Sequence, residues 1–237
     1  MPVNLTSAPA GGYSGYQIDQ SMVLDGSSDY LSRTPGSAGN RRTFTISCWV
    51  KKTKTGINQG IFSVSNTAAI NWEIIFDSSD RIAVSGYNTS SYEARYISTR
   101  VFRDVGSWYH VVVAVDTEDG TASDRIKVWV NGDQLADFDT QTTYALNTDT
   151  LVNTTNIHYV GVRRYSTSYY YWPGYIAEFH FIDGQALTPT SFGEFYNGGN
   201  QWRPIQPSGL TYGTNGFYLP RSEEHTSELQ SQFRISY

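Results

Sequence analysis

Residues 108–116 read WYHVVVAVD, and residues 126–135 read IKVWVNGDQL. The first run is apolar at nearly every position, which is typical of a central strand that is covered on both faces. The second contains Asn131-Gly132, a pair that tolerates positive φ at both positions and so predicts a tight turn between strands at 125–130 and 134–138. This pair of segments predicts the centre of an antiparallel sheet.

Further strands are predicted on both sides of this centre. Residues 43–51 alternate cleanly, and we expect the face that carries Cys48 to be buried. Trp49 lies on the opposite face, where we expect it to pack under a covering loop; the alternative is that it lines a concave groove. The other predicted strands are 21–24, 71–76, 81–87, 157–162 and 175–182. Strands at such short intervals predict an all-β, two-sheet antiparallel jelly-roll sandwich.

One short helix is predicted at 188–196. Thr188 fits an N-cap, and Pro189 fits the first helical position, where a missing backbone N–H costs nothing. The sequence elsewhere offers no long stretch of strong helix formers, so the rest of the domain is expected to be strands and turns.

Composition excludes several classes of protein. The net charge is −5, with no basic stripe, which argues against nucleic-acid binding. No run of about 18 apolar residues is present, so no membrane span is predicted. The first residues lack the charged start and apolar stretch of a signal peptide. With 1 Cys, no internal disulfide can form.

The two ends of the chain differ from the middle. Residues 1–17 are rich in Gly, Ser, Pro and Tyr and are expected to be a flexible lead-in to one domain at 18–219. Residues 221–231 read RSEEHTSELQS, which the start of a widely used DNA-sequencing adapter encodes in this frame. Ile235-Ser236-Tyr237 match the same adapter after its variable index. We therefore interpret 220–237 as adapter translation, and expect the domain to be truncated at its C-terminus.

Four segments carry a resemblance to a known fold family. They are MVLDGSSDYLSR (22–33), FTISCWVKK (44–52), the central hairpin at 108–135, and GYIAEFHFIDGQALTPTSF (174–192). In this order they resemble the laminin-G-like, concanavalin A-like lectin/glucanase superfamily. The resemblance implies a jelly-roll sandwich, and it implies lectin or glucanase relatives.

A narrower resemblance is carried by YQID (16–19), SAGNRRTFTISCWVKK (37–52), FRDVGSWYH (102–110), FIDGQALTPTSFGE (181–194) and YGTNGFYL (212–219). These strings resemble structural proteins of marine tailed-phage virions. The resemblance implies a virion or extracellular location, other virion subunits as partners, and assembly as a homo-oligomer.

Catalysis is not expected. Retaining glucanases of this fold carry paired carboxylates on one strand, about 5–5.5 Å apart, in an E-x-D-x-x-E pattern. The chain has no such string, and its strand acids Glu73 and Glu178 stand alone. His110, His158 and His180 have no nucleophile motif beside them. We predict no catalytic residues and no enzyme.

Calcium is the one cofactor that the fold resemblance suggests. Asp25 occupies a position that matches a ligand in family members, so a calcium site is a hypothesis here. The alternative is that Asp25 stabilises its own turn. An Asp that relatives often carry after the G-Y-I motif is Ala177 in this chain, which speaks against a family-type site.

Aromatic residues predict a ligand surface. The richest cluster, RRYSTSYYYW at 163–172, is expected to be a loop between two strands. Flat rings stack on the apolar faces of sugars, so a glycan or polysaccharide is the expected ligand. The candidate binding residues are Tyr165, Tyr169, Tyr170, Tyr171, Trp172 and Tyr87. Tyr92 and Tyr96 form a weaker group with Tyr87. The alternative is that these rings pack on the sandwich edge or on a neighbouring subunit.

Together these features predict a non-catalytic binding, adhesion or assembly module of a phage virion protein, in a tail or surface appendage. A carbohydrate-binding, lectin-like module of a bacterial surface protein is the alternative. A glycoside hydrolase, the third alternative, lacks its acids.

Overall fold

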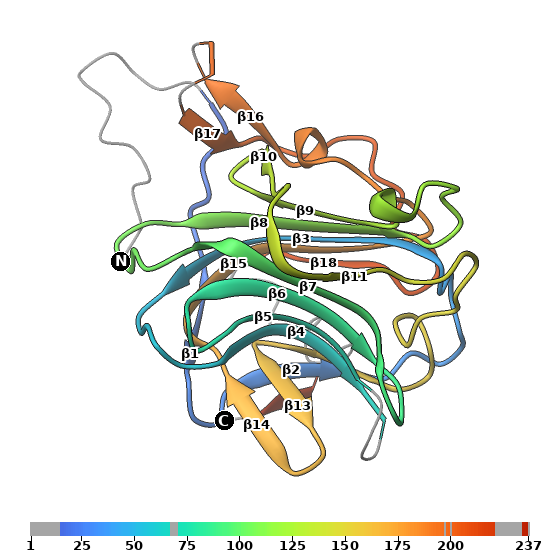
Figure 1. The fold of residues 1–237 in the computed structure, drawn as a ribbon. Coiled ribbons are helices and arrows are strands. Elements are labelled where there is room, and N and C mark those ends of the chain that lie inside the picture. The colour runs from blue at the N-terminus through green and yellow to red at the C-terminus, as the bar shows by residue number, and fades with distance from the viewer. Residues whose placement is uncertain (1–14, 67–70, 197, 200, 221–233, 237) are drawn as a thin grey trace, which may run out of the picture.

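The computed structural model of the chain describes residues 15–66, 71–196, 198–199, 201–220 and 234–236. It is an antiparallel two-sheet sandwich, which confirms the predicted fold class (Figure 1). Residues 1–14 of the predicted lead-in lie outside the described residues, as do 221–233 and 237 of the predicted adapter segment. Within the described residues, no helix is long and apolar enough to cross a membrane.

Two large sheets form the sandwich. The first runs in the order β1 (Met22–Asp25), β15 (Pro173–Asp183), β3 (Thr43–Lys52), β8 (Tyr109–Asp116), β9 (Ile126–Val130) and β10 (Asp133–Gln134), with β18 (Phe217–Leu219) also paired to β15. The second runs in the order β11 (Phe138–Thr142), β7 (Tyr92–Val101), β6 (Arg81–Tyr87), β5 (Asn71–Phe76), β4 (Gln59–Ser65), β12 (Ile157–Val160), β2 (Tyr30–Arg33) and β19 (Arg234–Ser236).

Two small hairpins stand outside the large sheets. They are β13 (Val162–Tyr165) with β14 (Ser168–Tyr171), and β16 (Gly193–Tyr196) with β17 (Gln201–Pro204). Two 3-10 turns, η1 (Ala122–Asp124) and η2 (Pro189–Ser191), complete the described elements.

The core lies between the two large sheets. On β3 the alternation predicted from the sequence holds, because Phe44, Ile46, Cys48 and Val50 all point inward and are at most 1% exposed. Burial raises the pKa of the Cys48 thiol, so this cysteine is an inert core residue. Trp49, on the opposite face, is also buried, under Trp108 and Trp202 among others.

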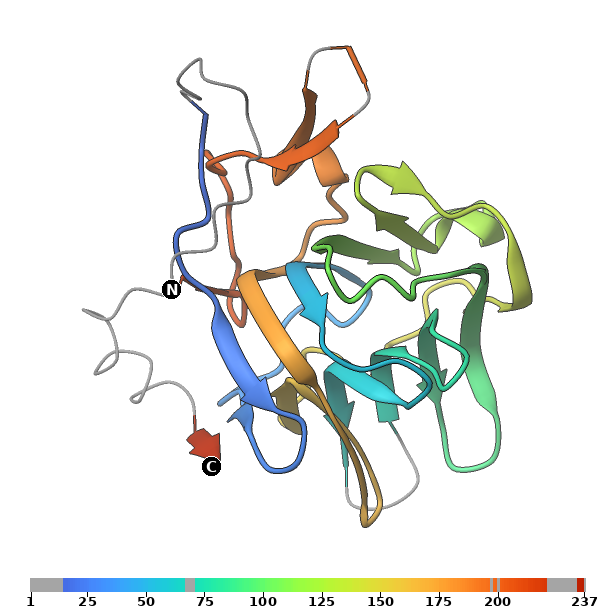
Figure 2. The ribbon, with the colours of Figure 1, turned by 90° about the vertical axis from the view of Figure 1, so that its left-hand side faces the viewer.

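The outer face of the second sheet is curved. Strands β4–β7 arch so that their hollow side turns away from the other sheet and toward the β13–β14 hairpin (Figure 1). We call the outward side chains of β4–β7 the concave face. In the view turned by 90°, the hairpin lies between the blue strands of the N-terminal part and the cyan and green strands of the concave face (Figure 2).

Three local predictions were wrong. The helix predicted at 188–196 is a 3-10 turn at Pro189–Ser191 followed by strand β16, because Gly193 and the aromatics after it pair with β17. The strand predicted at 134–138 is interrupted: β10 ends at Gln134, and the chain crosses to the second sheet before β11. The loop predicted at 163–172 is largely the β13–β14 hairpin.

Candidate functional site

The β13–β14 hairpin crosses the outer side of β4, and two small residues of β4 make this crossing possible. A Cβ on Gly60 would collide with the backbone of Val162 and Arg163. Ser63 fixes the crossing point, since its hydroxyl donates to the Val162 carbonyl (2.9 Å) and accepts from the Arg164 amide (3.2 Å). The hairpin is therefore anchored to the sheet through backbone groups, which leaves its side chains to project on either side.

One side of the hairpin faces the concave face. Strand alternation places Arg163, Tyr165 and Tyr170 there, since Arg163 pairs with Tyr170 across the hairpin. The Arg163 guanidinium lies over both rings, 4.9 Å from each centroid. Its Nε donates to Glu73 Oε2 on β5 at 2.5 Å, and Asn71 donates to the same oxygen at 2.6 Å. These contacts hold the guanidinium and both tyrosines in one orientation.

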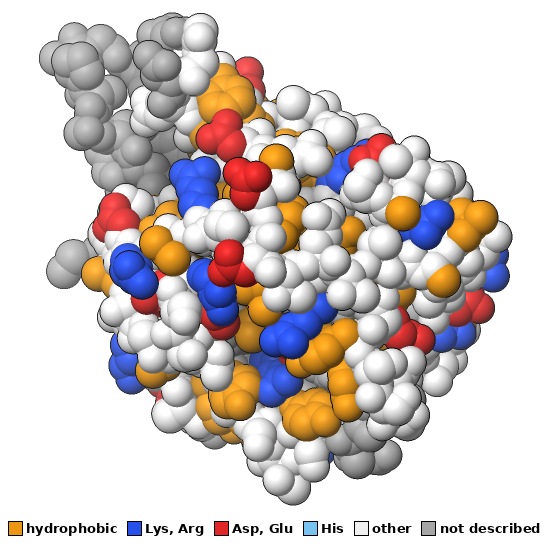
Figure 3. Space-filling view, viewed as in Figure 1, with side chains coloured by type: hydrophobic (Ala, Val, Ile, Leu, Met, Phe, Trp, Pro, Cys, Tyr) orange, Lys and Arg blue, Asp and Glu red, His pale blue; other side chains and the backbone are white. Residues whose placement is uncertain are grey.

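The same cluster extends along β6 and β7. The ring centroids of Tyr87 and Tyr165 are 6.2 Å apart, and those of Tyr87 and Tyr92 are 5.0 Å apart. Arg95 lies over the Tyr92 ring at 4.3 Å. We call this set the concave-face cluster, which consists of Glu73, Tyr87, Tyr92, Arg95, Arg163, Tyr165 and Tyr170. Figure 3 shows basic and hydrophobic side chains, the latter including tyrosines, side by side in the lower half of this view.

The other side of the hairpin carries a second group. Tyr169 and Tyr171 stack with their ring planes 11° apart and their centroids 5.7 Å apart. Arg164 donates to the Tyr159 hydroxyl at 2.6 Å and lies over the Tyr169 ring at 5.5 Å. Tyr30 completes the group beside Tyr159 and Tyr171. We call this set, Tyr30, Tyr159, Arg164, Tyr169 and Tyr171, the flank cluster.

Two of the predicted aromatic residues do not reach the surface. Trp172 is 0% exposed and packs against Phe76 in the core, so it is removed from the ligand surface. The hairpin ends at Tyr171, and alternation turns the next side chain inward. Tyr96 is 1% exposed and packs against Phe138 between the sheets, so it does not join Tyr87 and Tyr92.

Asp25 closes its own turn. Its Oδ1 accepts hydrogen bonds from the amides of Ser27 (2.8 Å), Ser28 (2.9 Å) and Asp29 (3.0 Å), and the two serine hydroxyls donate to its Oδ2. These bonds, led by the one from the Ser27 hydroxyl, lower the pKa of Asp25 well below its usual range. Among the described residues, no three His, Cys, Asp or Glu side chains gather into a metal-binding group. The carboxylate on which the calcium hypothesis rests is therefore already bonded by donors of its own turn.

The two lone strand acids do not meet. Glu73 lies on the concave face of the second sheet, while Glu178 lies on β15 in the first sheet, where it accepts from the Tyr218 hydroxyl at 2.7 Å. Each is therefore engaged by its own neighbours. The pair does not form the facing carboxylates that glycoside hydrolysis uses.

A small cavity on the outer side of the first sheet contains a fully buried histidine, His110. The cavity is lined by Ser47, Trp49, His110, Glu178, His180, Phe192, Pro204, Ile205 and Pro207. His110 Nε2 lies 2.9 Å from the Ser47 hydroxyl, and the Trp202 indole donates to His110 Nδ1 at 2.9 Å. Because an indole N–H can only donate, Nδ1 must be the unprotonated nitrogen, and Nε2–H donates to Ser47. His110 therefore cannot take a proton from Ser47.

The sequence indicated some of these residues and missed others. The run of tyrosines marked the hairpin, but Arg95, Glu73, Tyr30 and Tyr159 join it through long-range pairing that no local pattern reveals. One signal was available: the Arg163-Arg164 pair, on an alternating segment, places one guanidinium on each side of a strand.

Known proteins resemble the chain over most of its length. A family model described as the concanavalin A-like lectin/glucanases superfamily matches residues 25–191. No curated protein sequence matches the chain.

Solved structures share the fold at low sequence identity. Domain 4 of AbnA, a GH43 extracellular arabinanase from Geobacillus stearothermophilus, in complex with arabinotriose, matches at a TM-score of 0.53 and 19% identity, over 76% of this chain and 79% of that one. A putative carbohydrate binding protein from Bacteroides ovatus matches at 0.51 and 16%, over 70% of this chain and 46% of that one. A heptameric SAP-like pentraxin from Limulus polyphemus matches at 0.50 and 16%, over 81% and 86%.

Proposed function

Because the chain belongs to the concanavalin A-like lectin/glucanases superfamily, we propose that it is a non-catalytic binding module for a glycan, with its site at the concave-face cluster. The observation that carries the proposal is the Arg163 guanidinium fixed between Tyr165 and Tyr170, 4.9 Å from each ring centroid, on an arched sheet. The flank cluster supplies a second set of rings on the other side of the same hairpin.

The chemistry of the cluster suits a sugar. Tyrosine rings offer flat apolar surfaces for the C–H face of a pyranose or furanose ring, and their hydroxyls add hydrogen bonds at the edge. Tyr92 is 40% exposed and Tyr169 is 36% exposed, so both sides of the hairpin present aromatic surface to solvent. The rings are already oriented by one another and by arginines, which lowers the entropy cost of binding.

Binding without catalysis follows from the acids of the site. Glu73, the acid of the concave-face cluster, is 5% exposed and is already bonded to Arg163 and Asn71. The other lone strand acid, Glu178, lies on β15 of the first sheet, so the two do not form the carboxylate pair that glycoside hydrolysis uses. Two similar structures, an arabinanase domain with arabinotriose and a putative carbohydrate binding protein, support a glycan as the ligand class.

For the biological setting we propose a surface appendage of a phage virion, where the module adheres to a host glycan or to neighbouring subunits. The support is the run of strings from YQID (16–19) to YGTNGFYL (212–219). A lectin-like module of a bacterial surface protein is the alternative. Genes for terminase or portal proteins beside this gene support the virion; a secretion or cell-wall anchoring cluster there supports the bacterial protein.

Affinity electrophoresis of the whole chain through gels that contain bacterial and plant polysaccharides tests the binding role. We expect retardation by at least one polymer, and at least about tenfold weaker binding for Tyr170→Ala. The matched control is Tyr196→Ala, because Tyr196 is also exposed and also stacks under an arginine (Arg203, 4.2 Å) but lies on the β16–β17 hairpin. Equal loss in both variants, or no retardation of the folded protein by any polymer, contradicts the proposal.

A further inference from the structure

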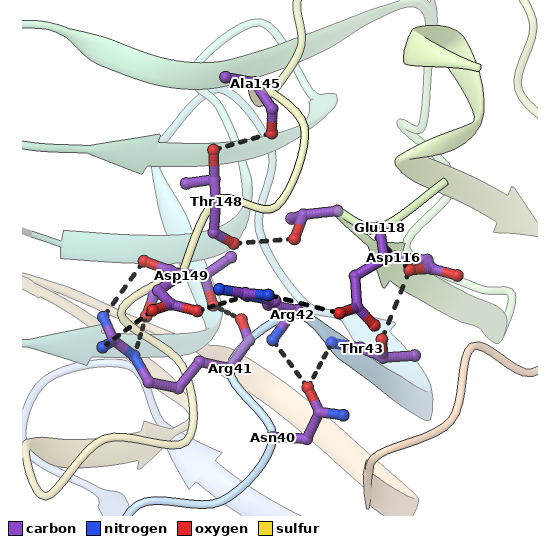
Figure 4. A network of polar contacts seen from close by, with 11 residues as sticks. Asn40, Arg41, Arg42, Thr43, Asp116, Glu118, Ala145, Thr148 and Asp149 are labelled. Atoms are coloured by element: carbon purple, nitrogen blue, oxygen red, sulfur yellow. Dashed lines mark hydrogen bonds and ion pairs between the residues drawn. The ribbon is translucent and has the colours of Figure 1, made fainter. Parts of the chain in front are cut away.

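Several arginines of the described residues are paired with carboxylates, whereas Arg95 and Arg164 of the site are not. Arg42, for example, bonds Asp149 at 2.7 Å and Glu118 at 3.5 Å in the network at the start of β3 (Figure 4). Within the described residues, Arg95 and Arg164 form no ion pair with any carboxylate; their partners are Tyr92 for Arg95, and Tyr159 and Tyr169 for Arg164. Arg33, Arg100 and Arg125, outside the site, share this property: Arg33 and Arg125 bond backbone carbonyls, and Arg100 lies over Phe102. Although the net charge of the chain is −5, one arginine on each side of the β13–β14 hairpin, Arg95 and Arg164, therefore has no ion-pair partner among the described residues.

Arg163 is compensated, but only through one of its nitrogens. Its Nε is bonded to Glu73, while its two terminal amino groups have no hydrogen-bond acceptor among the described residues. The guanidinium is held by that bond and by the rings of Tyr165 and Tyr170. A guanidinium held in one orientation, with both terminal amino groups unbonded, can donate two parallel N–H bonds to a planar carboxylate.

The acids near the site are already engaged. Glu73 accepts hydrogen bonds from Arg163 and Asn71. Glu93, beside Tyr92 on β7, accepts from the Asn88 side chain at 3.3 Å, and in the part of the chain that the structure describes it forms no ion pair with Arg95. Asp25, whose charge acts on Tyr171 in the flank cluster, is bonded by the donors of its own turn. The unpaired positive charge of Arg95 and Arg164 is therefore available to a ligand, and it lies among rings that suit a sugar.

We infer that the glycan is acidic, a polysaccharide that carries carboxylate groups, as in a uronic acid polymer. This inference rests on the proposed glycan-binding function and names its substrate class. The polymer would lie across the hairpin. Its sugar rings would stack on Tyr165 and Tyr170, and its carboxylates would meet Arg95, Arg163 and Arg164. An acidic protein repels polyanions at long range, so binding of this kind depends on the local site rather than on overall charge.

The test uses polysaccharides in matched pairs that differ in charge. These are polygalacturonate with its fully methyl-esterified form and alginate with its carboxyl-reduced form, with a neutral arabinan added, all measured with the whole chain by affinity electrophoresis. We expect at least about tenfold tighter binding to the charged member of a pair, weakening as salt is raised. Arg95→Gln and Arg164→Gln are each expected to lose several-fold in affinity for the charged member alone.

Lys54→Gln is the control, because it removes the same charge from an exposed residue outside both clusters. Arg163 is left intact, since its removal would strand buried Glu73. Equal binding to the charged and neutral members overturns the acidic ligand and leaves the glycan-binding function standing. Loss of affinity in Lys54→Gln equal to that in Arg95→Gln overturns the assignment to this site. No binding to any polymer overturns both proposals.

Discussion

Arg163 on β13 passes directly over Gly60 on β4, and a side chain at position 60 would occupy the space of its backbone. Gly60→Ala is expected to push the hairpin off the sheet, destabilise the protein by about 1–3 kcal/mol, and weaken ligand binding. Urea unfolding and affinity electrophoresis measure the two effects. Gly36→Ala is the control, because a Cβ there meets nothing within 4 Å; if both variants behave alike, the hairpin does not depend on Gly60.

Trp172 and Tyr170 are close in sequence but have opposite roles. Trp172→Ala removes a side chain that is 0% exposed, so we expect it to lower the free energy of unfolding by about 3–5 kcal/mol. Tyr170→Ala removes a partly exposed ring and is expected to cost about 1 kcal/mol or less in stability while it weakens binding. Chemical denaturation of both variants, followed by tryptophan fluorescence and circular dichroism, decides the point. A Trp172→Ala protein of normal stability would contradict the buried placement.

Lys52 and Asp80 form a buried ion pair, 2.6 Å apart, with side chains that are 0% and 5% exposed. Lys52 also donates to the Phe102 carbonyl at 3.0 Å. Asp80→Asn leaves the ammonium without its counter-charge, and we expect a loss of about 3–5 kcal/mol in unfolding free energy. Asn tolerates the positive φ of 63° at this position, so the backbone is not the cause. In Lys52→Met/Asp80→Asn, a smaller loss than the sum of the single variants is expected from a denaturation cycle.

Acid is expected to unfold the protein partly through two histidines. Burial lowers the pKa of His110 to about 3 and that of His158 to about 4. In each, one ring nitrogen accepts from a fixed N–H, from Trp202 for His110 and from Asn153 for His158, so a proton there has no acceptor. Since the unfolded chain protonates near pH 6.5, stability is full above that pH and falls as the pH drops toward 4 and then 3.

The expected loss from these histidines amounts to several kcal/mol at pH 4 relative to pH 7. Urea midpoints measured from pH 7 down to pH 4 check this decline. Proton NMR of the imidazole rings isolates the histidines from the carboxylates that also titrate in this range. A ring signal from His110 or His158 that titrates near pH 6.5 in the folded protein would refute the assignment.

We further propose that residues 220–237 are foreign to the domain, although Arg234–Ser236 pair with the edge of β2 as β19. A chain that ends at Leu219 is then expected to keep its fold and its ligand affinity. A chain that ends at Gly216 is the contrast, because it loses Phe217 and Leu219, which are 6% and 7% exposed in the core. Thermal unfolding of the two truncated proteins and of the whole chain tests the boundary. A large loss of stability on cutting at Leu219 would show that the tail contributes to the domain.

Much of the fold could be predicted from local pattern. The alternation on β3, the apolar run on β8 and the Asn131-Gly132 turn each report a property of neighbouring residues, and all three were confirmed. The helix at 188–196 failed because Thr188 and Pro189 fit the start of any helical turn, while the pairing of Gly193–Tyr196 with a strand downstream ended it.

The site was harder to predict, because its geometry depends on where the hairpin lies. The sequence marked the tyrosines of 165–171 but assigned them to a loop, and it could not separate Trp172 from them, since alternation decides which ring turns inward. Arg95 and Glu73 reach the cluster through pairings across four strands. The structure shows that β13 crosses β4 at Gly60 and Ser63, and this crossing separates the hairpin tyrosines into the concave-face cluster and the flank cluster.

The close approach at Gly60, the Ser63 hydroxyl, the Arg163–Glu73 ion pair and the backbone ladder of the hairpin hold it over β4, so few of its other outward side chains are needed for folding. With the exception of Arg163, whose loss would strand buried Glu73, residues at 164–165 and 168–171 can therefore change in evolution faster than the sheets beneath them. A lineage that must follow a changing target could exchange specificity by replacing side chains within one ten-residue segment, while Gly60, Ser63, Arg163 and the core stay unchanged.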